Sequence, residues 1–299
     1  GALKRFVKMQ EEYNCYYMVA NLHALTVRRE PEELKQNIYK ILATYIAAGL
    51  DPDKSTIFLQ SQVHEHAELG WVLDCYTYMG ELSRMTQYKD KSAKHADNIN
   101  AGLFTYPSLM AGDILLYQTD LVPTGEDQKQ HVELTRNIAE RFNNLYGETF
   151  KIPEPFIEKT GARIMGLQDP TSKMSKSSTL ANDTILLIDT PEVIMKKIKK
   201  AVTDSEGIVK FDEKNKPGIS NLMEIYGTIT NKTMDEVEKE FEGENYGSFK
   251  VAVANAIIKE LEPFQNKYND LMKNPKKLEE IYHKGAEKAA KIASKTMND

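Results

Sequence analysis

The fold class is indicated most clearly by CYYMVANLHALTVRREPEELKQNIYKILATYIAAGLDPDKSTIFLQ (Cys15–Gln60). Its two short apolar runs, CYYMVAN and TIFLQ, are typical of buried strands. Between them, PEELKQNIYKILATYIAAG has the spacing of a helix, with Pro31 in its first turn and Gly49 just after its end. Strand, helix and strand in this order form a βαβ unit, so we expect a parallel sheet with helices on both faces.

The alternation of short strands and long helices continues to about residue 170. YPSLMAGDILLYQ is a helical pattern, TDLVPTG runs from a strand into a loop, and EDQKQHVELTRNIAERFNNLYG is a helix ended by Gly147. After KMSKSS (173–178) the pattern changes. TPEVIMKKIKKAV begins a helix at Pro191, and from Gly218 almost everything is helical. We therefore expect an α/β domain followed by a helical domain, with the boundary near KMSKSS.

Composition restricts the class of protein. The net charge of −5 over 299 residues leaves no general polycation, so any contact with RNA must be local. No stretch approaches the roughly 20 apolar residues of a membrane span, which predicts a soluble protein that contacts no membrane. The only cysteines, Cys15 and Cys75, lie in apolar runs and are predicted to be reduced core thiols of a cytoplasmic protein.

KMSKSS combines two lysines, Lys173 and Lys176, with small hydroxyl side chains and has no obvious core face. Such a segment is either a solvated loop or a mobile clamp on phosphate. The residue types alone do not separate these two interpretations.

Asp113 is a lone carboxylate in the apolar run LMAGDILLY. Burial of a carboxylate costs several kcal/mol unless a group donates a hydrogen bond to it. The donor is either a ligand N–H in an apolar pocket or a backbone or arginine partner, and both interpretations stay open here.

Gly125 in TDLVPTGEDQKQH follows a strand and leads into a helix whose first turn is predicted to contain Glu126, Asp127 and Gln128. Ligands of open parallel sheets bind beyond the carboxyl ends of strands, where glycine lets the backbone approach closely. Asp127 can accept from ribose hydroxyls. Alternatively, the acidic residues only complement the helix dipole.

Two lysine-rich segments are either solvated surface or contacts to phosphate or RNA. They contain Lys89, Lys91 and Lys94 on a predicted loop, and Lys196, Lys197, Lys199 and Lys200 on a predicted helix.

His64 and His66 in VHEH alternate as on a strand or loop, and no further ligands at suitable spacing predict a metal site. The chain also lacks a nucleophile elbow, a Walker loop and a dinucleotide glycine fingerprint. The sequence therefore argues against hydrolases of that type, P-loop enzymes and the commonest dehydrogenases.

KMSKS after ARIMGLQDP resembles the second signature of the class I aminoacyl-tRNA synthetases. The stretches FTYPSLMAGDILLY, LVPTGEDQKQHVELTRNIAERFN and AVTDSEG with KPGISNLM narrow this resemblance to the bacterial tryptophanyl-tRNA synthetases, from Gly1 nearly to the end of the chain. Tyrosyl-tRNA synthetases share the fold and the lysine motif, but GEDQKQH and KPGISNL favour the tryptophan enzymes.

The resemblance implies a tryptophan site. The aspartate matching Asp113 accepts a hydrogen bond from the indole N–H, and the residues that surround the ring and the amino group match His23, Tyr106, Met110 and Gln128. A buried acceptor discriminates strongly, because a substrate without the donor leaves it empty.

The resemblance also implies the reaction. The tryptophan carboxylate attacks the α-phosphorus of MgATP, pyrophosphate leaves, and the acyl group moves to the 2′-hydroxyl of the terminal adenosine of tRNA(Trp). Such chemistry depends on positioning and on neutralising phosphate charge, which makes Lys173 and Lys176 the predicted catalytic residues. The predicted ATP contacts are Gly125, Glu126, Asp127, Ile164, Lys173, Met174, Ser175, Lys176, Ser177 and Lys91. No tightly bound cofactor or resident metal is expected.

By the same resemblance, residues 1–178 are a Rossmann-like catalytic domain that includes the KMSKS loop. Residues 179–275 are a helical domain on the anticodon side of the tRNA, and residues 276–299 are a C-terminal helix that packs back on the catalytic domain. We also expect a homodimer joined through residues 60 to 110.

Three features depart from the family. Its members begin with a strand and a glycine-rich first signature, so we expect a further segment before Gly1; without one, a non-catalytic relative that binds tRNA or tryptophan is the alternative. Asn21 and Leu22 replace Asp-Gln, and Ser178 replaces an aspartate after KMSKS.

Overall fold

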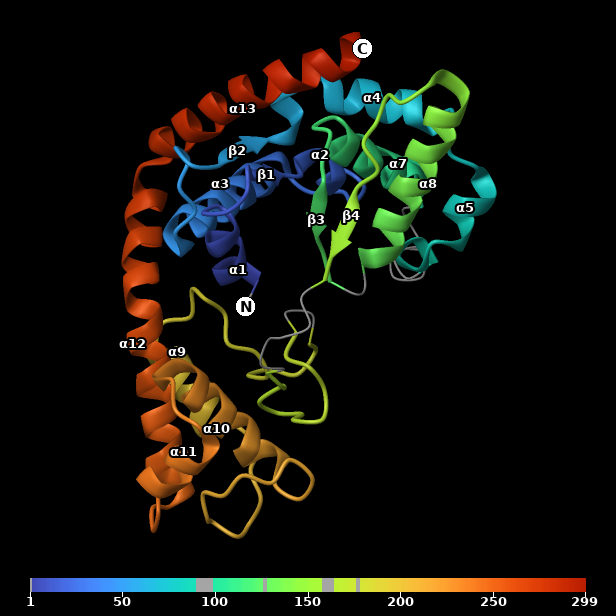
Figure 1. Ribbon diagram of the computed structural model, residues 1–299. Helices are drawn as coiled ribbons and strands as arrows, with labels where there is room; N and C mark the ends of the chain where they lie inside the picture. The colour runs from blue at the N-terminus through green and yellow to red at the C-terminus, as the bar shows by residue number, and fades with distance from the viewer. Residues whose placement is uncertain (1, 90–98, 126–127, 158–163, 176–177) are drawn as a thin grey trace. The chain divides into compact units, whose positions relative to one another are not determined.

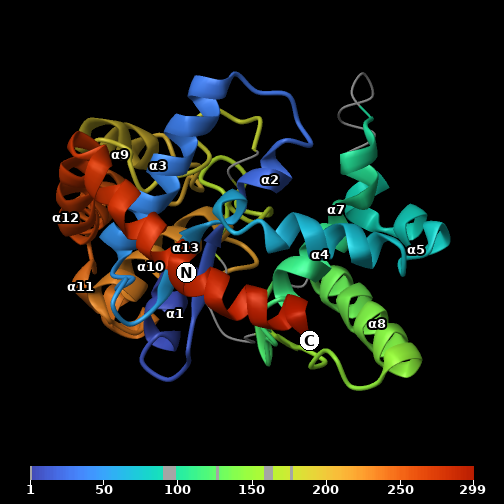
Figure 2. The ribbon, with the colours of Figure 1, turned by 90° about the horizontal axis from the view of Figure 1, so that it is seen from above.

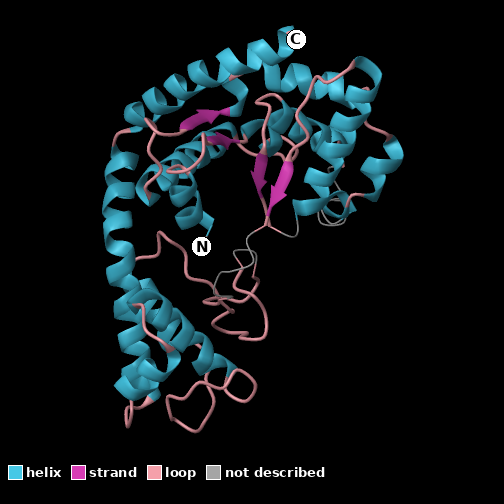
Figure 3. Ribbon diagram, viewed as in Figure 1, coloured by secondary structure: helices cyan, strands magenta, loops and turns pink. Residues whose placement is uncertain are grey.

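The computed structural model describes residues 2–89, 99–125, 128–157, 164–175 and 178–299. The chain forms two compact units, one made of residues 1–159 with 270–299 and the other of residues 160–269. Figure 1 labels their elements, and Figure 3 shows the strands, all four of which belong to the first unit. Each unit is described by itself, and the predicted domain bounds at residues 178 and 275 stay a prediction.

The predicted βαβ unit is confirmed in the first unit. β1 (Tyr16–Val19) and β2 (Thr56–Leu59) pair in parallel, and α3 (Pro31–Ala48) connects them. Pro31 occupies the first helical turn, where its missing N–H leaves no intrahelical bond unmade. Gly49 ends the helix with a φ of 110°, a conformation that glycine adopts without strain. Every residue of β2 is buried, as in other parallel sheets.

A second parallel pair consists of β3 (Leu121–Pro123) and β4 (Glu154–Phe156), which α8 (Lys129–Tyr146) connects. Within the described residues, the predicted sheet is therefore present as two parallel pairs. The register is Tyr16–Thr56, Tyr17–Ile57, Met18–Phe58 and Val19–Leu59 in the first pair, and Leu121–Glu154, Val122–Pro155 and Pro123–Phe156 in the second.

The C-terminal helix α13 (Pro275–Asn298) packs against β2, as Figures 1 and 2 show. Gly285 permits this contact, because a β carbon there would collide with the carbonyl oxygen of Ile57. Ala289 and Ala293 continue the buried face of α13. Small residues at helical spacing thus let this helix approach the strand closely.

The first unit contains further short and long helices. They are α1 (Ala2–Met9), α2 (Asn21–Ala24), the 3₁₀ helix η1 (Gln60–Gln62), α4 (Glu65–Asp74), α5 (Met79–Arg84) and α7 (Ala101–Leu115). α4 and α7 approach closely, because a β carbon on Gly112 would lie only 3.1 Å from the backbone nitrogen of Gly70. This contact positions Asp113, the next residue on α7, beside α4.

The second unit consists of a short antiparallel segment followed by helices. The helices are α9 (Pro191–Lys199), α10 (Pro217–Thr230), α11 (Met234–Glu240) and α12 (Tyr246–Lys273), the last of which continues beyond the unit. The predicted helix start at Pro191 is confirmed, and the hydroxyl of Thr190 caps it by accepting from the amide of Val193.

Each unit has its own apolar core. The core of the first unit includes Phe58, Leu73, Leu115 and Ile138, and that of the second unit includes Ile194, Ile198, Leu222, Phe249 and Val253. In the described part of the chain, no helix combines the length and the apolar character needed to cross a membrane.

The two cysteines have different surroundings, and both are free thiols. Cys15 is buried as predicted, but Cys75 is exposed, so its prediction as a core thiol is wrong. Trp71 and Cys75 are four residues apart and lie on the face of α4 away from buried Leu69 and Leu73. The apolar residues of this segment therefore lie on both faces of the helix, and only one of these faces is buried.

Candidate functional site

Asp113 on α7 accepts hydrogen bonds from three side chains, and only 7% of its own side chain is exposed. His66 Nδ1 lies 2.6 Å and Gln60 Nε2 2.7 Å from Oδ1, whereas His23 Nε2 lies 2.7 Å from Oδ2. The protein donors are therefore imidazole and amide groups from α2, η1 and α4. They are neither the backbone group nor the arginine that one interpretation of the sequence required.

His66 is held at both ring nitrogens and is fully buried. Its Nδ1 faces Asp113, and its Nε2 lies 2.7 Å from the hydroxyl of Tyr117. Because a carboxylate can only accept, Nδ1 carries a proton, and in the neutral imidazole Nε2 accepts from the O–H of Tyr117. The ring of Tyr117 stacks on Tyr16 with centroids 4.7 Å apart.

Two opposing effects set the pKa of Asp113. Burial disfavours the charged carboxylate, and the hydrogen bonds from His23 and His66 favour it. The hydrogen bonds prevail, so the pKa of Asp113 is lowered from its usual range. Burial and the charge of Asp113 together raise the pKa of Tyr117. At neutral pH the site thus holds a carboxylate and a protonated phenol.

The short helix α2, which carries His23, is anchored to η1. Asn21 Nδ2 donates to the hydroxyl of Ser61 at 2.8 Å, and the amide of Ser61 donates back to Asn21 Oδ1 at 3.0 Å. The amide of Leu22 donates to Oε1 of Gln60 at 3.0 Å. The side chain of Asn21 and the backbone amide of Leu22, at the two positions where the resemblance predicts Asp-Gln, therefore anchor α2 beside His23.

Tyr106, Met110 and Asp113 are spaced at i, i+4 and i+7 on α7 and thus share one face of this helix. The rings of His23 and Tyr106 meet edge to face with centroids 6.1 Å apart. The hydroxyl of Tyr106 lies 2.8 Å from Nε2 of His131 on α8. Burial raises the pKa of Tyr106 to about 12. The structure thus brings together three of the predicted tryptophan-site residues, with Met110 on the same helix face.

The segment after β3 starts at Gly125, which is exposed, and Gln128 precedes α8 and donates its amide to the Gly125 carbonyl at 3.0 Å. α8 begins at Lys129 with Gln128 directly before it, and Glu126 and Asp127 lie outside the described residues, so the predicted helical turn at 126–128 stays a prediction. The contact between Gln128 and tryptophan stays a prediction.

Some residues with predicted roles lie outside the described residues. They are Lys91, Lys94, Glu126, Asp127, Lys176 and Ser177. Lys89, from the same basic segment as Lys91, is described and exposed.

The lysine motif begins on an antiparallel pair in the second unit. Residues 164–166 face residues 172–174, with amide-to-carbonyl distances of 2.8 and 3.1 Å. Lys173 is exposed opposite Met165, and Ser175 follows as an exposed residue. The predicted adenine contact at Ile164 therefore lies beside the predicted phosphate contacts Lys173 and Met174.

Asn221 on α10 holds the outer edge of this antiparallel pair and is 3% exposed. Its Oδ1 accepts from the amide of Met165 at 2.8 Å, and its Nδ2 donates to the carbonyl of the same residue at 2.9 Å. The side-chain amide thus takes the place of a neighbouring strand. It attaches the segment that pairs with Lys173 to the helical part of the unit.

The turn between the paired segments is anchored by Asp183, which is buried. Its Oδ1 accepts from the amides of Gln168 at 2.8 Å and Asp169 at 3.2 Å. Ser178, at the position where the resemblance predicts an aspartate, accepts from the amide of Leu180 at 3.3 Å. A serine is therefore sufficient to make this local turn contact.

The basic helix α9 and the residue directly after it contribute three exposed lysines, Lys196, Lys199 and Lys200. Lys197 differs, because its ammonium group lies 2.6 Å from a carboxylate oxygen of Asp189 and is only 14% exposed. The candidate RNA-facing surface of α9 is thus reduced to the other three lysines.

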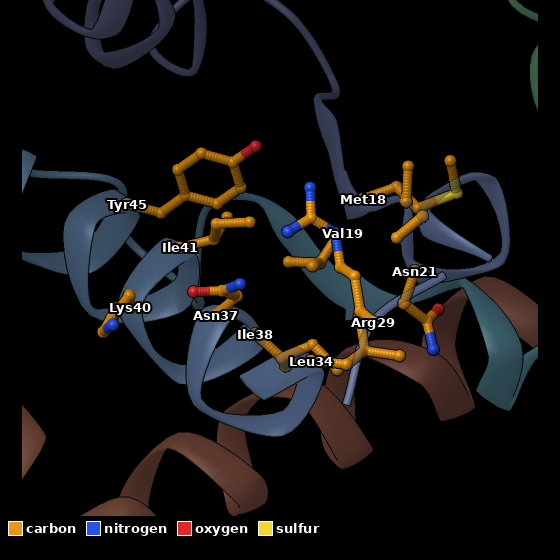
Figure 4. A pocket seen from close by; sticks show the side chains of 12 residues that line it. Met18, Val19, Asn21, Arg29, Leu34, Asn37, Ile38, Lys40, Ile41 and Tyr45 are labelled. Atoms are coloured by element: carbon orange, nitrogen blue, oxygen red, sulfur yellow. The ribbon is translucent and has the colours of Figure 1, made fainter. Parts of the chain in front are cut away.

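A cavity of about 490 Å³ lies at the carboxyl end of β1, between β1 and α3 (Figure 4). Leu34, Ile38, Ile41 and Tyr45 of α3 form its apolar wall. Arg29 extends over it and pairs with Glu33 at 2.8 Å. None of the predicted site residues lines this cavity.

Three residues of this site, His66, Gln60 and Tyr117, were not predicted from the sequence. The prediction that His66 lies on a strand or loop is wrong, because it lies in the first turn of α4. A signal was present: His66 is spaced with Leu69 and Leu73 on one apolar helix face, where an imidazole requires a polar partner.

Comparison with known proteins relates the chain to one family. The family described as tRNA synthetases class I (W and Y) matches residues 1–262. The tryptophan–tRNA ligase of Clostridium tetani is 55% identical over 298 residues, which cover 100% of this chain and 88% of that protein. The tryptophan–tRNA ligase of Bacillus anthracis is 53% identical over 297 residues, covering 99% and 90%.

Solved structures agree with these relatives. The tryptophanyl-tRNA synthetase of Campylobacter jejuni, complexed with ADP and tryptophan, has a TM-score of 0.90 and 39% identity, covering 100% of this chain and 92% of that chain. The enzyme of Mycoplasma pneumoniae has a TM-score of 0.84 and 37% identity, covering 99% and 89%.

Proposed function

The chain belongs to the class I tRNA synthetases of the W and Y family, and within it to the tryptophan–tRNA ligases, and from this we propose the following reaction. L-Tryptophan is activated by ATP to tryptophanyl-adenylate with release of pyrophosphate. The acyl group is then transferred to the 2′-hydroxyl of the terminal adenosine of tRNA(Trp). The identity of 55% across the whole chain carries this proposal.

We propose that Asp113 accepts the indole N–H of tryptophan. Its buried, hydrogen-bonded carboxylate supports this role, because the lowered pKa keeps it charged at neutral pH. His23, Tyr106, Met110 and Gln128 would surround the ring and the amino group. The ring of phenylalanine carries no polar hydrogen, so phenylalanine would leave the acceptor unpaired and bind weakly.

ATP is proposed to bind as its Mg²⁺ complex. Ile164 would contact adenine, residues 125–127 the ribose, and Lys91 with residues 173–177 the phosphates. Lys173 and Lys176 would neutralise the charge that develops on the phosphate oxygens. The exposure of Lys173 on a segment that Asn221 attaches to α10 supports this role.

For tRNA, we propose that Lys196, Lys199 and Lys200 of α9 contact the phosphate backbone, within the helical domain of residues 179–275. Their exposure without the pairing that occupies Lys197 supports this assignment. The proposed site of action is the cytoplasm.

A homodimer is the proposed assembly. Trp71, Tyr78, Met79 and Tyr146 are each at least 60% exposed, and they lie in α4, directly before α5, in α5 and at the end of α8. Tyr76 links these elements through its hydroxyl, which lies 2.7 Å from that of Tyr146. Such apolar surface is typical of subunit contacts. Sedimentation of the double variant Trp71→Lys with Met79→Lys should show a monomer, and an unchanged assembly would reject this surface.

The test of the proposed reaction is ATP–pyrophosphate exchange by the full-length protein with tryptophan or tyrosine. Exchange with tryptophan alone supports the proposal, and exchange with tyrosine would favour the tyrosyl alternative. Absence of exchange, combined with binding of tryptophan or tRNA, would favour a non-catalytic relative.

A further inference from the structure

We propose that His66 is a positioning residue that fixes Asp113 so that its Oδ2 oxygen receives the N–H of the bound amino-acid side chain. This inference rests on the proposed function, in which Asp113 binds the indole of tryptophan. It assigns different tasks to the two oxygens of one carboxylate.

The two oxygens of Asp113 have different numbers of protein donors. A carboxylate oxygen has two lone pairs in its plane. Oδ1 accepts from His66 at 2.6 Å and from Gln60 at 2.7 Å. These two hydrogen bonds occupy both of its lone pairs. Within the part of the chain that the structure describes, Oδ2 accepts only from His23, at 2.7 Å. A ligand N–H is therefore directed to Oδ2, on the side of His23.

His66 is suited to hold Oδ1 because its ring cannot turn freely. It is fully buried, and its centroid lies 5.8 Å from that of Phe58. The hydroxyl of Tyr117 occupies its Nε2 at 2.7 Å, which keeps the proton of the neutral ring on Nδ1, toward Asp113. Tyr117 thus selects the tautomer that donates to the carboxylate.

Removal of His66 should also change when Asp113 is charged. The polar groups that face Asp113 are His23 of α2, Gln60 of η1, His66 of α4 and Tyr117 after α7. Without His66, burial remains and one favourable hydrogen bond is lost, so the pKa of Asp113 rises. A carboxyl group binds the indole as the anion, above its pKa. When the pH is lowered, a variant without His66 should therefore lose tryptophan affinity at a higher pH than the unsubstituted protein does.

The experiment measures the Kd of L-tryptophan by calorimetry with the full-length protein between pH 5 and 8. His66→Phe keeps a ring of similar size but removes the donor. His66→Asn restores an amide N–H near the position of Nδ1. His64→Asn is the matched control, because His64 is exposed at the start of the same helix. Asp113→Asn serves as the reference for the proposed function.

At pH 7.5, His66→Phe should raise the Kd roughly 10- to 100-fold, as for loss of a hydrogen bond to a charged group. As the pH is lowered, the affinity of His66→Phe should begin to fall at a higher pH than that of the unsubstituted protein. His66→Asn should recover part of the loss. His64→Asn should change neither the Kd nor its pH dependence. A Kd that is unchanged, or raised equally at every pH, would overturn the positioning role.

Two further results keep the outcome unambiguous. If Asp113→Asn leaves the Kd unchanged, the proposed role of Asp113 fails, and the inference fails with it. If His66→Phe does not fold, as judged by circular dichroism, Tyr117→Phe replaces it. This variant frees the tautomer of His66 and should raise the Kd less than tenfold with the same shift along pH. A Kd and a pH dependence that are both unchanged in Tyr117→Phe would reject the proposal.

Discussion

Asp113→Asn is the most direct perturbation of the proposed tryptophan site. The amide has almost the size of the carboxylate, but it presents one acceptor and one donor in place of two acceptors. Three N–H groups, from His23, His66 and Gln60, point at this side chain. The substitution therefore tests hydrogen bonding with little change in packing.

The structure predicts which way the new amide turns. If its nitrogen replaced Oδ1, two donors, His66 and Gln60, would face a third. If its nitrogen replaces Oδ2, only His23 must change tautomer, and this orientation is favoured. The ligand N–H then has no acceptor, and the loss of a hydrogen bond to a charged group is about 1.5–3 kcal/mol. That corresponds to a roughly 10- to 150-fold decrease in kcat/KM for tryptophan.

The assay is ATP–pyrophosphate exchange by the full-length protein, with tryptophan and ATP varied separately. The KM for ATP should stay nearly unchanged, because none of the hydrogen-bond partners of Asp113 is a predicted ATP contact. Asp120→Asn is the control, since Asp120 is an exposed aspartate whose side chain is 76% accessible. An equal loss for tryptophan and ATP, or no loss for tryptophan, would refute the assignment of Asp113 to the indole.

Other substitutions test the second unit. Asn221→Leu removes both side-chain partners of the Met165 backbone, and each unpaired group costs about 1–3 kcal/mol. The denaturation midpoint and the rate of adenylate formation should therefore both fall. An unchanged rate of adenylate formation would reject the link between Asn221 and the lysine motif. Lys176→Ala should lower the activation rate far more than tryptophan affinity, and an unchanged rate in single-turnover kinetics would exclude a transition-state role. Lys196→Ala with Lys200→Ala should weaken tRNA binding and flatten its salt dependence; if filter binding shows neither effect, these lysines are only solvated surface.

Local rules predicted most of the elements correctly. α3 and α9 begin at Pro31 and Pro191, and α3 and α8 end before Gly49 and Gly147. Proline and glycine act through the backbone of their own turn, so the chain neighbours are sufficient to predict their effect.

Contacts between distant residues could not be predicted in this way. Asp113 required a donor, but His66 and Gln60 lie 47 and 53 residues away in the chain. Cys75 was assigned to the core because it lies in an apolar run, but such a run does not show which of its side chains a neighbouring element covers. The role of Asn221 depends likewise on a partner, Met165, that is 56 residues distant.

Periodicity, local turn chemistry and long matched stretches were sufficient to predict the βαβ unit, the helical second part, the family and the buried carboxylate. The way in which Asp113 is held follows from contacts between elements that are distant in the chain. Gly112 and Gly70 let α7 and α4 approach, and this contact places His66 against Oδ1 while His23 reaches Oδ2 from α2. The direction of a hydrogen bond depends on both partners, and the sequence around Asp113 contains only one of them.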